Sequence, residues 1–405
     1  MRTSCDSLSH AVGIPSGRGH ALRTRTTWAA LAGLLLLPLS FPSRAAAQEY
    51  KVTAFKIISQ NGGRVDWDPS GSDRIAFDKK NADGFYDVYT IRSDGTGLVS
   101  LTDGRAGIWQ RQNGNPAWHA SGKYIVFQSE HPEHVLMNDK WSPDPGVGVH
   151  CELWATNPDG SSFWQLTQHE VKKRILFDDT VAMGVLNPKF TRDGSTLLWT
   201  ERFSKGGKWG RWRIWMADFV VDPQKGPSLR NQRVVFTPTE AMGHYVTCMG
   251  MTLDKKKLLF AGGLSGQDEF GMDLYLFDLA SKALVNLTND PNEWTEGSAI
   301  TPDGKKIVYT SNKGYPHNYQ DKHWYWQKVK REYWMMNLDG SNKQQVTHCN
   351  TPGHLEYSQR PLIVTDCSWS PDGRRLASTV GEDMGGPEKA EFQLRVGVFT
   401  FSVSP

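Results

Sequence analysis

The chain has 405 residues, of which 38% are hydrophobic and 11% aromatic, and it contains 39 glycines. This composition favours strands separated by tight turns over helical packing. The formal net charge is only +3, and no basic tract suggests a nucleic-acid partner. We therefore expect an all-β protein that does not bind nucleic acid.

The first predicted element is a secretory signal peptide over residues 1–47. The apolar stretch from Trp28 to Phe41 follows several arginines and precedes Ala45-Ala46-Ala47, a small-residue cleavage site before Gln48. It is shorter than the roughly 18 residues needed to span a bilayer. The segment holds five arginines and one aspartate, so its removal changes the net charge from +3 to −1. These features predict a periplasmic or secreted protein that does not span the membrane.

Four cysteines lie beyond this segment, which are too few for a disulfide framework. They are Cys151, Cys248, Cys349 and Cys367. Export permits disulfides, and Cys349–Cys367 is the first pair to test. Buried free thiols are an equally good interpretation of the same residues.

A short hairpin sequence recurs six times along the rest of the chain. Its turn is clearest at Ser370-Pro371-Asp372-Gly373, where proline presets φ, aspartate bonds to its own backbone and glycine takes a positive φ. Each copy places an apolar residue before the turn and an apolar strand after it. In chain order, these apolar residues are Trp67, Trp118, Phe190, Met251, Ile300 and Trp369.

Each hairpin is followed by an alternating strand and then, in most copies, by a short segment that ends in Leu-Thr or a similar pair. The alternating strands include DVYTI (87–91) and ELWAT (152–156), and the first closing pair is Leu101-Thr102. Four antiparallel strands repeated radially form a propeller blade. We therefore predict one six-bladed propeller over 48–405. Residues 50–58 should supply the outer strand of the last blade, built from 366–401, and thereby close the ring.

These residues resemble the TolB-like six-bladed propellers, whose repeat carries a W-S-P-D-G core and an L-T end. The resemblance covers nearly all of the chain after residue 47, and the separate N-terminal domain of true TolB is not expected. Related propellers occur in periplasmic binding proteins, in substrate-gating domains of peptidases and in some polysaccharide lyases. The sequence has no G-x-S-x-G elbow, so we do not expect a peptidase. Nor do we predict a Tol–Pal role.

The long insertions fall on one face of the predicted ring, which argues for function there. Aromatic rings stack on sugar faces, while imidazole, carboxylate and guanidinium groups bond hydroxyls or uronates. The leading prediction is that a monomer binds a ligand on this face: a polysaccharide, a peptide or a periplasmic protein. The candidate ligand-binding residues are His244, Glu296, Asp366, Arg202, Trp294 and Trp324.

The alternative function is a metal-assisted polysaccharide lyase or hydrolase at the channel mouth. The resemblance to propeller lyases implies histidines, a divalent metal and a base that removes a proton beside a bound uronate. The candidate metal ligands are His244, His348 and His354, with Glu296 and Asp366 nearby. No catalytic residue can be assigned, no cofactor is certain, and the sequence leaves open whether the protein is an enzyme. The hypothesis requires at least two of these imidazoles to lie within about 5 Å of each other.

Overall fold

The computed structural model describes residues 49–134, 144–171, 181–206, 210–265, 271–290, 292–318, 328–386 and 388–404. All of them belong to one compact unit, Ala47–Pro405. The predicted signal peptide and Trp324 lie outside the described residues. Within the part that is described, no helix is long and apolar enough to cross a membrane.

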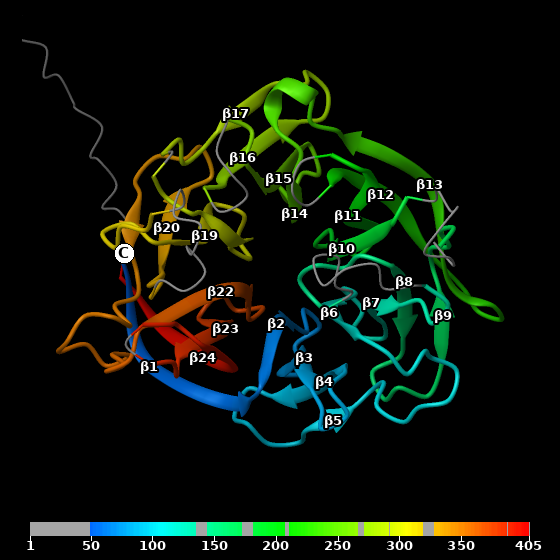
Figure 1. Cartoon of the computed structure of the whole chain (residues 1–405), viewed down its shortest axis with the longest axis horizontal. Helices are drawn as coiled ribbons and strands as arrows, with labels where there is room; N and C mark the ends of the chain where they lie inside the picture. Colours follow the sequence, from blue (N-terminus) through cyan, green and yellow to red (C-terminus); the bar gives the residue numbers. More distant parts are fainter. Residues whose placement is uncertain are drawn as a thin grey trace, which may run out of the picture. The chain divides into compact units, whose positions relative to one another are not determined.

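The described strands form six antiparallel sheets of four strands each, arranged in a ring (Figure 1). Blade 1 consists of β2 (Gly62–Trp67), β3 (Arg74–Lys80), β4 (Tyr86–Arg92) and β5 (Val99–Ser100). Blade 2 consists of β6 (Asn113–Trp118), β7 (Ile125–Glu130), β8 (Cys151–Thr156) and β9 (Phe163–Gln165). Blade 3 consists of β10 (Gly184–Phe190), β11 (Thr196–Ser204), β12 (Arg211–Asp222) and β13 (Gly226–Phe236).

The remaining three blades complete the ring. Blade 4 consists of β14 (Val246–Met251), β15 (Lys257–Gly262), β16 (Asp273–Asp278) and β17 (Leu284–Asn286). Blade 5 consists of β18 (Glu296–Ile300), β19 (Lys306–Ser311), β20 (Glu332–Asn337) and β21 (Gln344–Gln345). Blade 6 consists of β22 (Leu362–Trp369), β23 (Arg375–Asp383), β24 (Phe392–Ser404) and β1 (Glu49–Gln60). The short 3₁₀ helix η2 (Glu240–Met242) precedes blade 4. The predicted all-β, six-bladed propeller is confirmed.

The N-terminal strand closes the ring as predicted. β1 pairs antiparallel with β24, from Glu49 opposite Ser404 to Gln60 opposite Arg395. The ring of Phe55 stacks on that of Phe399, with centroids 4.4 Å apart. The last blade therefore takes three strands from one end of the chain and its outer strand from the other.

The repeated turn has the predicted chemistry. In the last copy, the carboxylate of Asp372 accepts bonds from the Ser370 hydroxyl and the Arg374 N–H, at 2.5 and 3.1 Å. Gly373 has φ +68°, a conformation that residues with a side chain rarely adopt. These local bonds set the register of the two strands that the turn joins, β22 and β23.

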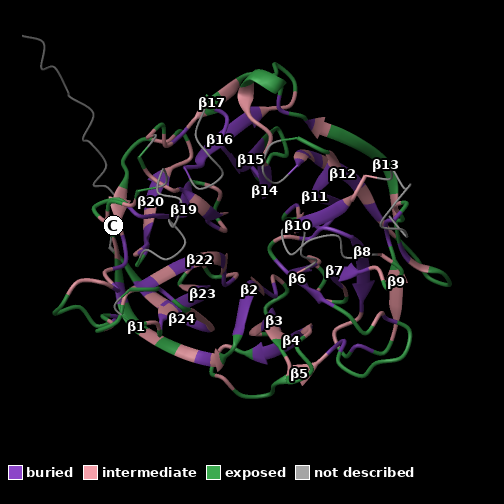
Figure 2. Cartoon of the chain, in the orientation of Figure 1, coloured by how far each residue is buried: buried purple, intermediate pink, exposed green. Residues whose placement is uncertain are grey.

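The hydrophobic core lies between the blades rather than in one central mass. Six clusters of buried apolar residues each join the facing sides of two neighbouring blades. The cluster between blades 6 and 1, for example, contains Trp67, Phe77 and Val398. Figure 2 shows that the sheets are mostly buried, while exposed residues collect in the connections. The repeat tryptophans Trp67, Trp118 and Trp369 therefore belong to the core.

Every innermost strand carries an irregularity at the same height in the channel wall. The register with the second strand shifts after Gly63, Gly114, Leu186, Cys248, Glu296 and Val364. Arg64, Asn115 and Asn187 adopt positive φ at these bulges. The freed N–H of Arg64 bonds Thr379 of the preceding blade at 2.6 Å, and that of Asn115 bonds Asp78 at 2.8 Å. The bulges thus link neighbouring blades around the channel.

Candidate functional site

The long connections lie at one end of the propeller, as the sequence predicts. This end, here called the long-loop face, carries the connections between second and third strands and those between blades. Among the described residues, 144–150, 312–318 and 346–361 are examples. The described connections at the opposite end are the short repeat turns. A ligand site formed by insertions must therefore lie on the long-loop face.

A carboxylate at the start of the third strand clasps the closing threonine in four blades. The threonine hydroxyl donates a hydrogen bond to the acid. It also accepts a hydrogen bond from the backbone N–H of the residue that follows the acid. In blade 5, Thr347 donates to Glu332 at 2.7 Å and accepts from the Tyr333 N–H at 2.8 Å. The other clasps are Asp87–Thr102, Glu152–Thr167 and Asp273–Thr288. This clasp explains the recurrent Leu-Thr ending of the repeat.

Substitution of Thr347 by valine should lower the free energy of unfolding by about 1–3 kcal/mol. The change leaves the buried Glu332 and the Tyr333 N–H each short of one partner. Urea unfolding followed by circular dichroism measures the effect. Thr237→Val is the control, because Thr237 lies exposed directly after the fourth strand of blade 3, where the clasp acid is absent. Equal stability of the two variants would contradict the clasp.

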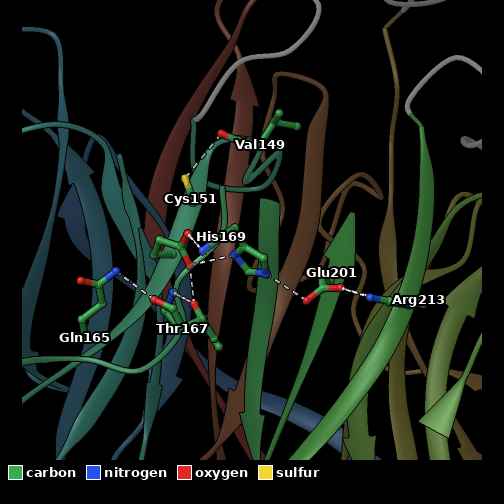
Figure 3. A network of polar contacts seen from close by, with 9 residues as sticks. Val149, Cys151, Gln165, Thr167, His169, Glu201 and Arg213 are labelled. Atoms are coloured by element: carbon green, nitrogen blue, oxygen red, sulfur yellow. Dashed lines mark hydrogen bonds and ion pairs between the residues drawn. The ribbon is translucent and has the colours of Figure 1, made fainter. Parts of the chain in front are cut away.

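Blade 3 departs from this pattern, because Arg213 occupies the position of the clasp acid. Its guanidinium bonds Glu201 at 2.7 and 3.0 Å. The other oxygen of Glu201 contacts Nε2 of His169 at 3.0 Å, and Nδ1 of His169 contacts Glu152 at 2.8 Å (Figure 3). The imidazole thus bridges carboxylates of blades 2 and 3. The sequence analysis missed this network, although the replacement of the repeat acid by Arg213 is visible when the repeats are aligned.

The charged side chains of this network are mostly buried. The side chains of Glu152 and Glu201 are 1% and 5% exposed, and that of His169 is 14% exposed. Burial alone would lower the pKa of His169, but its bonds to both glutamates outweigh burial and raise the pKa to about 9. The imidazole is therefore protonated at neutral pH. The positive charges of His169 and Arg213 then balance the negative charges of Glu152 and Glu201.

A second cluster lies at the channel mouth on the long-loop face and includes two predicted residues. Arg331 is 2% exposed and pairs with Glu296 at 3.1 Å. Its guanidinium also lies over the ring of Trp294, 4.4 Å from the centroid. It donates a further bond to the hydroxyl of Thr310. The sequence analysis did not select Arg331, because this residue belongs to no repeat motif. In the structure it contacts both Glu296 and Trp294 and so brings them together.

A third predicted residue, Asp366, faces another buried ion pair near the same mouth. Arg64 makes two 2.6 Å bonds to Asp78. Burial would lower the pKa of Arg64, but the carboxylate of Asp78 raises it overall, and Asp366 adds to that effect. Asp366 and Glu296 both help to raise the pKa of Tyr245, after burial as the main cause. The two predicted acids therefore act on one phenol and share the channel mouth.

Of the predicted metal ligands, two lie together. The rings of His348 and His354 stack with centroids 4.1 Å apart and an interplanar angle of 29°. Nitrogen lone pairs lie in the ring plane, so stacked imidazoles present faces to each other rather than ligand atoms. Among the described residues, no group of three or more His, Cys, Asp or Glu side chains could hold a metal ion. The pair meets the distance requirement, but its arrangement does not fit a shared metal.

The remaining predicted residues are Arg202, His244 and the four cysteines. Arg202 is buried and donates to the carbonyl of Ala182, and burial lowers its pKa to about 10. Nδ1 of His244 is buried without a hydrogen-bond partner among the described residues. The four described cysteines are buried free thiols, so the structure favours that interpretation over a Cys349–Cys367 disulfide.

Comparisons with known proteins agree on the fold. No protein-family model matches the chain, and no curated protein matches it. Among solved structures, TolB from Acinetobacter baumannii is 15% identical with a TM-score of 0.48, over 82% of this chain and 66% of that one. A putative TolB from Agrobacterium tumefaciens is 14% identical with a TM-score of 0.44, over 78% and 96%. An oligogalacturonate lyase in complex with manganese is 10% identical with a TM-score of 0.44, over 88% and 96%. The chain is thus similar to TolB-like propellers in fold.

Proposed function

We propose that this protein is a periplasmic or secreted propeller that binds a polar ligand at the channel mouth of its long-loop face. The observation that carries the proposal is the gathering of buried charge there: Arg331 with Glu296, and Arg64 with Asp78 and Asp366. Burying charge is costly and paired charges add little net stability, so such groups are frequent at functional sites. Arg64 is also held at φ +46°, which is strained for a residue with a side chain.

The open groups at the mouth suggest which chemistry the ligand brings. One oxygen of Glu296 pairs with Arg331, whereas its other oxygen and the carboxylate of Asp366 accept no hydrogen bond from the described residues. Both arginines already have carboxylate partners. The mouth therefore offers acceptors more than donors, which suits the hydroxyls of a glycan or the N–H and ammonium groups of a peptide.

The double variant Glu296→Gln/Asp366→Asn should weaken ligand binding by about tenfold or more, because two charge-assisted hydrogen bonds are lost. Glycan and peptide arrays probed with the wild-type protein identify the ligand, and titration calorimetry measures the change. Glu240→Gln is the control, because Glu240 is exposed and lies before blade 4. Unchanged binding in the double variant, or the same loss in the control, would contradict the proposed site.

The metal-assisted lyase or hydrolase remains the second candidate, supported by the close approach of His348 and His354. One imidazole would have to rotate out of the stack before both could bind one ion. Titration of the purified protein with Mn²⁺ or Zn²⁺, together with absorbance of unsaturated uronates during incubation with acidic polysaccharides, tests it. A His348→Ala variant that binds metal as the wild type does would remove this candidate.

A further inference from the structure

An open cavity lies between blades 2 and 3, beside the point at which blade 3 departs from the repeat. Its volume is about 530 Å³, within the range of roughly 300–1,000 Å³ typical of small-molecule sites. The cavity is lined by Gln165, Gln168, Met183, Arg213, Trp215 and Gln232, beside the network of His169. It belongs to neither the channel mouth nor the stacked histidine pair. We propose that this cavity is a second binding site, which takes a neutral, hydroxyl-rich ligand of sugar size.

The wall of the cavity is held rigidly. The Arg213 guanidinium packs on the rings of both Phe203 and Trp215, 4.8 and 4.9 Å from their centroids. Trp215 in turn stacks on Trp199 at 5.9 Å with an interplanar angle of 8°. The bonds of Arg213 to Glu201 fix the guanidinium in its own plane. A site preorganised in this way loses little freedom when a ligand binds.

Charge balance decides what the cavity accepts. Arg213 and protonated His169 neutralise Glu201 and Glu152, so the network has no net charge to attract an ion. Both oxygens of Glu201 are already bonded, so neither is open to a cation. An anion would have to compete with Glu201 for Arg213. A neutral ligand meets neither penalty.

The open hydrogen-bonding groups match hydroxyls. Gln168 and Gln232 are exposed and make no side-chain hydrogen bond within the described ranges. Gln165 donates to the Thr167 carbonyl at 2.9 Å, and no described residue donates to its amide oxygen. Nη1 of Arg213 adds a donor without a hydrogen-bonded acceptor among the described residues. Amides both donate and accept, as hydroxyls do, so a sugar can satisfy each group in turn.

The experiment titrates the full protein with neutral sugars, followed by saturation-transfer NMR and calorimetry. The panel contains glucose, galactose, mannose, N-acetylglucosamine, cellobiose and maltose, with glucuronate and galacturonate as charged counterparts. At least one neutral sugar should bind, and its uronate should bind about tenfold more weakly or worse. The variant Gln168→Ala/Gln232→Ala should weaken binding about tenfold or more, since each hydrogen bond contributes up to about tenfold. Gln359→Ala, an exposed glutamine before blade 6, should leave it unchanged.

Two comparisons separate this site from the channel mouth. The variant Glu296→Gln/Asp366→Asn should retain neutral-sugar binding, because its substitutions lie outside the cavity lining. Gln232→Trp should block the cavity without touching the charged network. The proposal is overturned if no neutral sugar on the panel binds, or if binding survives both cavity variants. If only the channel-mouth variant abolishes sugar binding, the cavity is not the site, although the proposed function stands.

Discussion

A chain that lacks residues 49–60 is expected to lose cooperative folding. The deletion removes the outer strand of the last blade, so β24 becomes an open edge along its whole length. It also removes the buried side chains of Val52 and Ile58 and the Phe55–Phe399 stack. We expect destabilisation of more than about 5 kcal/mol, comparable to the total stability of many domains. Thermal unfolding followed by circular dichroism measures it.

The control for this deletion changes β1 without removing it. Lys51→Ala alters an exposed side chain of the strand and should change stability by less than about 0.5 kcal/mol. Addition of a synthetic 49–60 peptide to the deleted chain should restore part of the transition. A deleted chain that unfolds at the wild-type temperature would show that closure of the ring does not stabilise it.

The second large effect is expected at the histidine that joins blades 2 and 3. Replacing His169 with alanine leaves Glu152 and Glu201 buried without their shared cation. Removal of one partner from a buried charge network typically costs about 3–5 kcal/mol. Urea unfolding at pH 7 measures the loss. His354→Ala, which removes an exposed imidazole from the same face, is the control and should change stability far less.

The same network predicts how wild-type stability depends on pH. The pKa of His169 is raised from about 6.5 to about 9 in the folded protein. Its contribution is therefore fully present below about pH 6.5 and is lost as the pH rises through about 9. A shift of this size corresponds to about 3 kcal/mol. Unfolding at pH 6, 8 and 9.5 should show this loss in the wild type but not in His169→Gln.

The fold could be predicted from the sequence because the fold is periodic. A turn such as Ser370-Pro371-Asp372-Gly373 sets its geometry by local bonds, and six copies define six blades regardless of the loops between them. The strand at 50–58 could be placed because the last repeat lacked a fourth strand. The clasp was visible only as a Leu-Thr ending, since its carboxylate lies fifteen positions earlier along the chain.

The site was less predictable because it depends on contacts between different repeats. Glu296 and Asp366 were placed near the channel from their positions in the inner strands, and both act on Tyr245. Arg331 and the bridge formed by His169 depend on which side chains of neighbouring blades converge, and spacing along the chain does not encode this. Comparison of equivalent repeat positions would have singled out Arg213, together with Arg395, which occupies the same position in blade 6 and pairs with Glu382.

The pairing of β1 with β24 also constrains the order in which the protein can be built. Glu49 lies opposite Ser404, so the first strand of the propeller leaves the ribosome long before its partner has been synthesised. Blades 1 to 5 can each form as soon as their own four strands have emerged, because their contacts are sequential. Blade 6 alone must wait for the end of translation. Until then the side chains of β1 that the folded protein buries, Val52 and Ile58, have no partner strand to cover them.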